Sequence, residues 1–130
     1  MTTAASYTHL NLETVADAAA ANGFGESGSA RFATGDLEAE RTGLAIHRLK
    51  PGRRQAFGHR HDAAEEVCVV VAGSGRVKLD DEIVELRERD ALRIAPAVAR
   101  RFEAGDAGLE FLVFGARHEG DGEILREFWT

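Results

Sequence analysis

The stretch FGHRHDAAEEVCVVVAGSG, residues 57–75, decides the fold because it joins a histidine pair, an apolar run and a glycine segment in that order. In an extended strand alternate side chains point to the same face, so His59 and His61 project together while Arg60 points the other way. Two neutral imidazoles on one face are suitable ligands for a single metal ion. The apolar run 67–72 that follows is typical of a buried strand.

A carboxylate would complete a set of two histidines and one carboxylate. Such a set suits Fe(II), Mn or Zn and leaves coordination positions open. Three acidic residues near the histidines compete for this role, namely Asp62, Glu65 and Glu66. A bare His-x-His also fits a polar strand end whose imidazoles bind water, and the residues by themselves leave that alternative open.

The totals of the chain exclude several classes of protein. With 130 residues, the chain is long enough for one domain with its own core. Its formal net charge of −6 argues against a nucleic-acid-binding protein, which would carry an excess of basic residues. Its one cysteine, Cys68, allows no intrachain disulfide and is expected in the core. We find no secretory signal and no run approaching the roughly 20 apolar residues of a membrane span, so we expect a soluble cytoplasmic protein.

The two ends of the chain differ from its middle. We expect residues 1–9 to be disordered and residues 10–130 to form a single domain. The alanine-rich segment 12–28 predicts at most a short peripheral helix, because alanine favours helix and the glycines end it. Near the other end, Phe128 and Trp129 are expected to dock on the domain or on a partner chain.

Beyond Gly28 the sequence predicts antiparallel β-structure, because short apolar runs alternate with Gly, Asp and Pro signals. The expected strands are 30–33, 43–50, 57–61, 67–72, 76–79, 82–86, 91–94, 100–104 and 109–115. Hairpin turns are expected at GSG 73–75 and DD 80–81, and a further turn is expected at GDAG 105–108. Short strands at this spacing indicate an all-β sandwich or closed barrel.

Residues 52–73 resemble the first motif of the cupin superfamily. That motif has a glycine, about five residues, His-x-His, three or four residues, a glutamate, six residues and a glycine. Here Gly52 is followed by six residues, one more than usual, and then by His59-Arg60-His61. Four residues lead to Glu66 and six more to Gly73, a step that selects Glu66 over Glu65.

Residues 89–104 resemble the second cupin motif, with substitutions at its marker positions. The places of its glycine, proline, second glycine and histidine are taken by Arg89, Ala95, Ala97 and Arg100. A register shifted by one residue puts Arg101 at the histidine position instead. In either register the histidine that would be a fourth metal ligand is missing.

The resemblance to small, single-domain bacterial cupins implies an antiparallel jelly-roll barrel, also called a double-stranded β-helix. It further implies an interior divalent metal ion such as Fe, Mn, Zn or Ni on His59, His61 and Glu66. A site without metal is left open as well, because the fourth ligand position holds Arg100. A homodimer joined through edge strands is also implied, and the REFWT tail, residues 126–130, could contribute to it.

The arginine at the fourth ligand position leaves three alternatives, because a guanidinium has no lone pair to give to a metal. Arg100 could lie beside the metal and bind an anionic substrate through a bidentate pair. It could instead pair with Glu66 in a metal-free cavity. If Arg100 pointed out of the barrel, Phe102 would be exposed as well, which is the poorer burial pattern.

Three further residues are candidates for lining a ligand cavity. They are Phe57, Phe102 and His47, and for the two phenylalanines plain core packing is the favoured interpretation. An inward His47 would reach the cavity, whereas the more apolar opposite face of its strand, with Leu44 and Ile46, favours an outward His47.

Two functions fit these residues. The first is a metal-dependent cupin that acts on a small anionic organic molecule, with oxygenase- or isomerase-type chemistry. The second is a metal-free binding or sensor protein in which Arg100 pairs with Glu66. The only general-base candidates are Glu65 and His47, so the sequence assigns no catalytic residue and leaves open whether the protein is an enzyme.

Overall fold

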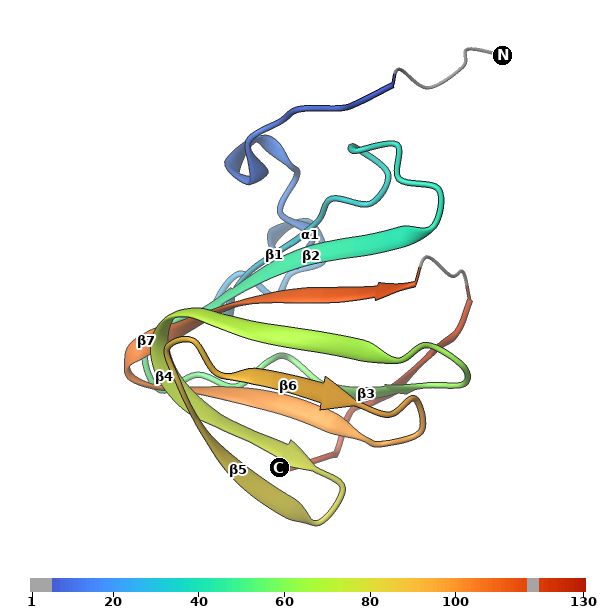
Figure 1. The fold of residues 1–130 in the computed structure, drawn as a ribbon. Helices are drawn as coiled ribbons and strands as arrows, with labels where there is room; N and C mark the ends of the chain where they lie inside the picture. Colours follow the sequence, from blue (N-terminus) through green and yellow to red (C-terminus); the bar gives the residue numbers. More distant parts are fainter. Residues whose placement is uncertain (1–5, 117–119) are drawn as a thin grey trace.

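Antiparallel strands make up most of the structure, a computed structural model that describes residues 6–116 and 120–130 (Figure 1). In the described residues the strands are β1 (Gly28–Phe32), β2 (Thr42–Leu49), β3 (Gly58–His61), β4 (Glu66–Leu79), β5 (Glu82–Arg87), β6 (Ala91–Ile94), β7 (Arg100–Ala116) and β8 (Gly122–Leu125). The expected antiparallel all-β architecture is therefore present. The short strand β8 was not expected from the sequence.

The long strands β4 and β7 organise the sheet. Strand β7 pairs with β2, β3 and β4, and β4 also pairs with β5 and β6, so one sheet curls around a common interior. Figure 1 shows β2, β7 and β4 side by side, with β6 following β4. This curl brings β3, which carries the two histidines, opposite the start of β4.

The turns predicted at 73–75 and 105–108 are wrong, because β4 and β7 run through both segments. The glycines there let two paired strands bend together instead of reversing. A Cβ on Gly73 would lie 2.0 Å from the carbonyl oxygen of Gly108, and one on Gly75 would lie 2.1 Å from that of Glu103. The pairing register shifts at this point, as expected for a bulge that bends a strand.

The remaining local predictions have mixed outcomes. The turn at Asp80–Asp81 is confirmed and joins β4 to β5. The predicted peripheral helix is reduced to a 3-10 turn, Leu12–Thr14, and one helical turn, α1 (Ala18–Ala21). Asp17 caps α1 and also accepts a hydrogen bond from the backbone of Ala30, which ties the segment to β1. Of the N-terminal residues expected to be disordered, 1–5 lie outside the described part, and 6–9 are exposed without helix or strand.

The C-terminal aromatics pack on their own domain, one of the two outcomes expected for them. The Trp129 ring lies under the guanidinium groups of Arg54 and Arg76, 4.2 and 5.1 Å from its centroid. Phe128 covers Gly58, where a Cβ would come within 2.7 Å of its ring. The tail therefore fastens the outer side of β3, next to the strand that carries the histidines.

The core lies between the curled halves of the sheet, where every second side chain of β4 and β7 faces inward. Its buried members are Leu49, Cys68, Val70, Val77, Leu86, Ile94, Phe102, Ala104, Leu109 and Phe111. Cys68 is thus a core residue, as expected. Among the described residues, no helix is both long and apolar enough to cross a membrane.

Candidate functional site

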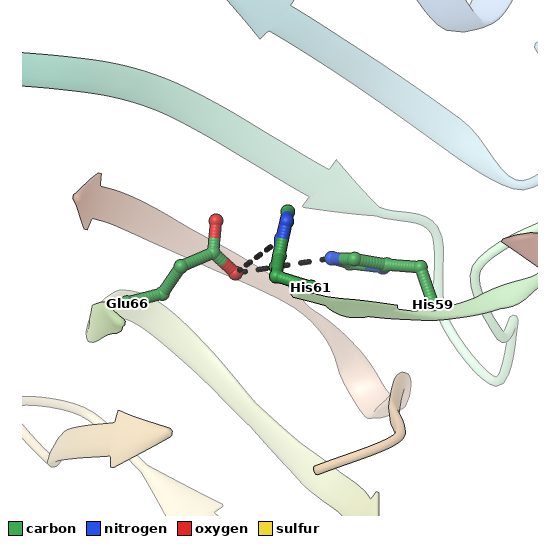
Figure 2. A group of neighbouring side chains, drawn as sticks. All are labelled: His59, His61 and Glu66. Carbon is green, nitrogen blue, oxygen red and sulfur yellow. Dashed lines mark ion pairs between the residues drawn. The ribbon is translucent and has the colours of Figure 1, made fainter. Parts of the chain in front are cut away.

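The structure brings His59, His61 and Glu66 together at the edge of the interior. Figure 2 shows both imidazoles, from β3, and the carboxylate, from β4, pointing toward one another. Oxygen Oε1 of Glu66 lies 3.4 Å from Nε2 of His61 and 3.8 Å from Nε2 of His59. The two rings are nearly perpendicular, with centroids 5.1 Å apart. Strand alternation therefore places the histidine pair as the sequence predicts.

The choice of Glu66 among three acidic residues agrees with the structure. Glu66 begins β4 on the inward face, whereas Glu65 is exposed and forms an ion pair with Arg93 at 3.1 Å. Asp62 is also exposed and lies outside the cluster. Because Glu65 faces away from the interior, it is also excluded as a general base for a ligand bound there.

Asp121, which sequence reasoning missed, holds the far side of His61. Its Oδ2 lies 3.5 Å from Nδ1 of His61, and its carboxylate accepts hydrogen bonds from the backbone of Asp62, Ala63 and Ala64. A carboxylate facing Nδ1 favours the proton on that nitrogen and leaves the Nε2 lone pair directed at the cluster. Asp121 is distant in sequence from the histidines, and no local pattern marks it.

Arg100 is buried beside the cluster, with 1% of its surface exposed. Its Nη1 donates to Oε1 of Glu66 at 3.0 Å, and its Nη2 donates to the carbonyl of Ala95 at 2.8 Å. The outward orientation of Arg100 is therefore excluded, and Phe102 is buried with it. Arg100 lies opposite His59 in the β3–β7 pair. It therefore occupies the position at which the second motif would normally supply the fourth metal ligand.

The charges of the site favour an ionised glutamate. Burial disfavours ionisation of Glu66, but the imidazoles of His59 and His61 and the Arg100 guanidinium outweigh it, so the pKa of Glu66 lies below its ordinary value. Burial lowers the pKa of Arg100, and the carboxylate of Glu66 opposes that effect. The cluster thus offers one anionic oxygen and two imidazole nitrogens in one place.

The donor set fits a divalent metal ion. Nitrogen and oxygen ligands lie roughly 2.0–2.2 Å from a zinc-type ion, so two ligands at octahedral or tetrahedral angles are roughly 3.0–3.5 Å apart. The separation of 3.4 Å between His61 and Glu66 lies in this range, and the 3.8 Å from His59 is slightly longer. The ligand atoms of all three residues lie within 4.8 Å of one another, so the partly exposed His59 ring would have to move toward the other two to complete the set.

A cavity of about 940 Å³ opens beside the cluster. The residues expected to line it are all on its wall, namely His47, Phe57, Arg100 and Phe102, together with His59, His61 and Glu66. The preference for an outward His47 is wrong. Its ring stacks on Phe111, with centroids 5.1 Å apart, because the inward positions of β2 face the aromatic side chains of β7.

Comparisons with known proteins were made by family model, sequence and structure. A family model described as "Cupin domain" matches residues 45–115. No curated protein shows a significant match to the sequence. The matched residues include the whole histidine and glutamate cluster, all of β4 and all of β7 except its last residue, Ala116.

Several solved structures share the fold. A cupin protein from Bacteroides fragilis is 23% identical, with a TM-score of 0.71, and the match covers 90% of this chain and 89% of that one. Oxalate decarboxylase from Bacillus subtilis is 26% identical, with a TM-score of 0.67 over 77% of this chain and 28% of that one. A Klebsiella pneumoniae protein with a double-stranded beta-helix domain is 13% identical, with a TM-score of 0.61 over 67% of this chain and 76% of that one.

These matches differ in the conclusions that they support. The chain spans less than a third of the decarboxylase's length, and the other two matches bear on the fold alone. The family model, in contrast, covers more than half of the chain. The curled antiparallel sheet is thus a cupin jelly roll, and the chain belongs to the cupin family.

Proposed function

We propose that this protein binds a divalent metal ion through His59, His61 and Glu66, and a small anionic organic ligand in the cavity beside it. The observation that carries this proposal is the convergence of both Nε2 atoms on one carboxylate oxygen at the edge of the cavity. A carboxylate ligand is supported by the likeness to oxalate decarboxylase, whose name assigns it a small dicarboxylate.

Each side chain has a separate task in this proposal. A bound ion would act as a Lewis acid toward a ligand oxygen. Arg100 keeps Glu66 ionised and in place, and its buried charge makes this end of the cavity favourable for an anion. A bidentate contact from Arg100 to the ligand would require it to release Glu66 or Ala95. The open coordination positions are compatible with oxygenase- or isomerase-type chemistry, and His47 is the base candidate that lies in the cavity.

A second candidate function rests on the contact between Arg100 and Glu66. At 3.0 Å the pair already satisfies both charges without a metal. The cavity would then serve a metal-free binding or sensor protein. The two candidates differ in the metal content they require and agree on the small-molecule ligand.

Elemental analysis distinguishes these two functions. Protein purified without a metal-affinity tag is loaded with Mn, Fe, Zn or Ni, desalted and measured. We expect about one equivalent in the wild type and in His9→Ala, which removes an exposed histidine outside the cluster, and loss of the metal in the His59→Ala/His61→Ala double variant. Less than about a tenth of an equivalent after loading would contradict metal binding.

The variant Arg100→His tests whether Arg100 occupies the fourth ligand position. The new imidazole would face the cluster from β7, directly across from His59. We expect tighter metal binding than in the wild type, because a cation is replaced by a ligand. Unchanged affinity in a folded variant would place that side chain away from the ion.

We also propose that the protein is a homodimer. Support comes from the outer face of β4 and β7, where Val67, Val71 and Phe114 are 37%, 42% and 37% exposed. This face differs from the edge strands and the REFWT tail that were expected to form the contact. Light scattering that gives the 14.0 kDa of one chain would contradict the dimer.

A further inference from the structure

A continuous run of rings crosses the cavity wall, and metal binding does not account for it. We call the four residues Phe102, Phe111, His47 and Phe32 the aromatic wall. Phe102 stacks on Phe111 with centroids 4.1 Å apart, and Phe111 stacks on His47 at 5.1 Å. The edge of Phe32 meets His47 at 5.7 Å. All four side chains line the same cavity.

The wall leads from the buried arginine to solvent. Phe102 follows Arg100 on the same face of β7 and is 3% exposed, and Phe111 is 1% exposed. Phe32, at the other end of the run on β1, is 56% exposed. Phe32 therefore contacts His47 through its edge and leaves more than half of its surface open to solvent at the cavity rim.

Two further exposed apolar side chains lie at the rim of the same cavity. Ile124 on β8 is 53% exposed and pairs across the strands with His59, so it stands beside a proposed metal ligand. Phe24 is 37% exposed and meets Phe57 edge to face at 5.7 Å. Both side chains line the cavity. The polar cluster is therefore bordered by apolar surface on more than one side.

The volume of the cavity also favours a ligand with a large apolar part. At about 940 Å³ it lies near the upper end of the range for drug-sized ligands, roughly 300–1,000 Å³. A two-carbon dicarboxylate would occupy a small fraction of this space and would leave the aromatic wall in contact with water.

We infer that the ligand is an amphipathic aryl carboxylate, in which the carboxylate meets the polar cluster and a ring system packs on the aromatic wall. This inference rests on the proposed function for its anionic end and adds the chemistry of the other end. Aromatic side chains favour stacked or edge-to-face contact with a ligand ring, and burying the ring removes apolar surface from water.

Calorimetric titration with 2-naphthoate, oxalate and acetate tests the inference. The metal content of the same sample is measured, and each titration is repeated on metal-free protein. We expect 2-naphthoate to bind at least roughly tenfold more tightly than oxalate or acetate. Oxalate binding as tightly as 2-naphthoate to metal-loaded protein would overturn the inference while leaving the proposed function intact.

A matched pair of variants tests the place of binding. Phe32→Ser removes the exposed end of the aromatic wall, and Tyr7→Ser removes an exposed aromatic residue that does not line the cavity. We expect Phe32→Ser to weaken 2-naphthoate binding roughly tenfold, with acetate and oxalate unchanged, and Tyr7→Ser to have no effect. Equal effects of the two variants would overturn the inference.

Two other results have defined meanings. If 2-naphthoate does not bind with or without metal, the inference fails, and the metal content of the sample still reports on the metal half of the proposed function. If Phe32→Ser changes the mass measured by light scattering and leaves 2-naphthoate binding unchanged, Phe32 belongs to a contact between copies and the inference is overturned.

Discussion

The cavity has two parts that are built in different ways. Its polar end consists of His59, His61, Glu66 and Arg100, which are held by ion pairs and hydrogen bonds. The aromatic wall described above is held by ring contacts between β1, β2 and β7. The polar end depends on charge, and so on pH and on bound ions, whereas the wall depends on packing.

This difference separates the work of the two parts. An end built from charges can exchange one partner for another, as when a metal ion would share Glu66 with Arg100. A wall whose deep members are 1% and 3% exposed cannot change without opening a void. The protein therefore keeps its adaptable chemistry at one end of the cavity and a rigid surface along the other.

The largest expected effect comes from the wall. Phe111→Ala removes a ring that is 1% exposed and stacked on two neighbours, so we expect the free energy of unfolding in urea to fall by about 3–5 kcal/mol. Tyr7→Ala, which removes a side chain that is 81% exposed, should cost less than about 1 kcal/mol. Similar losses for the two variants would show that Phe111 is not packed as described.

At the polar end, Arg100→Met should destabilise metal-free protein by about 3 kcal/mol, because Glu66 is left without its cation. The double variant Arg100→Met/Glu66→Gln removes both charges and should be less destabilised than the sum of the single variants by about 1–3 kcal/mol. Urea unfolding in EDTA measures all four proteins. Strict additivity would mean that the pair does not couple, and so would remove the distinction between the two parts.

His47 is the titratable member of the wall, and it should respond to pH. Burial, with the nearby charge of His59, lowers the pKa of His47 to about 4. The unfolded chain, with a pKa near 6.5, binds more protons between those values, so stability rises with pH from about 4 to 6.5 and is constant above. Because the ring is only partly buried, we expect a contribution of about 2 kcal/mol.

The variant His47→Gln isolates this contribution, because Asp17, Glu66 and Glu103 also have lowered pKa values and lose stability as the pH falls. The difference between wild type and His47→Gln in urea unfolding should shrink below pH 6.5 and level off near pH 4. A difference that is independent of pH would show that His47 is solvated like a surface histidine.

The two parts also differ in how far the sequence predicts them. His59, His61 and Glu66 lie within eight positions, so strand alternation and motif spacing were enough to group them. The aromatic wall brings Phe32 close to Phe111 because β1 pairs with β2 and β2 pairs with β7. The sequence alone does not predict which residues of these strands lie opposite one another.

Two errors have a similar cause. A pair of glycines is compatible both with a strand that reverses in a turn and with a strand that only bends. The close approach of Gly73 to Gly108 shows that the strand bends here. His47 was expected to face outward because Leu44 and Ile46 are more apolar. An antiparallel sheet with an apolar outer face does not obey that rule, and the exposed Val67 and Phe114 show such a face here.

The smallest effect is expected at the border between the two parts. Cys68 shares the inward face of β4 with Glu66 and is 3% exposed, and burial, with the nearby Glu66 charge, raises the pKa of its thiol to about 12. Because the thiolate is the reactive form, iodoacetamide at pH 8 should leave native protein unlabelled and should label protein unfolded in guanidinium completely. Mass spectrometry reads the result directly, since Cys68 is the only cysteine. Labelling of native protein at the rate of a free thiol would mean that solvent passes the polar end of the cavity and reaches Cys68. The tightly packed core would then begin deeper in the protein than the burial of Cys68 indicates.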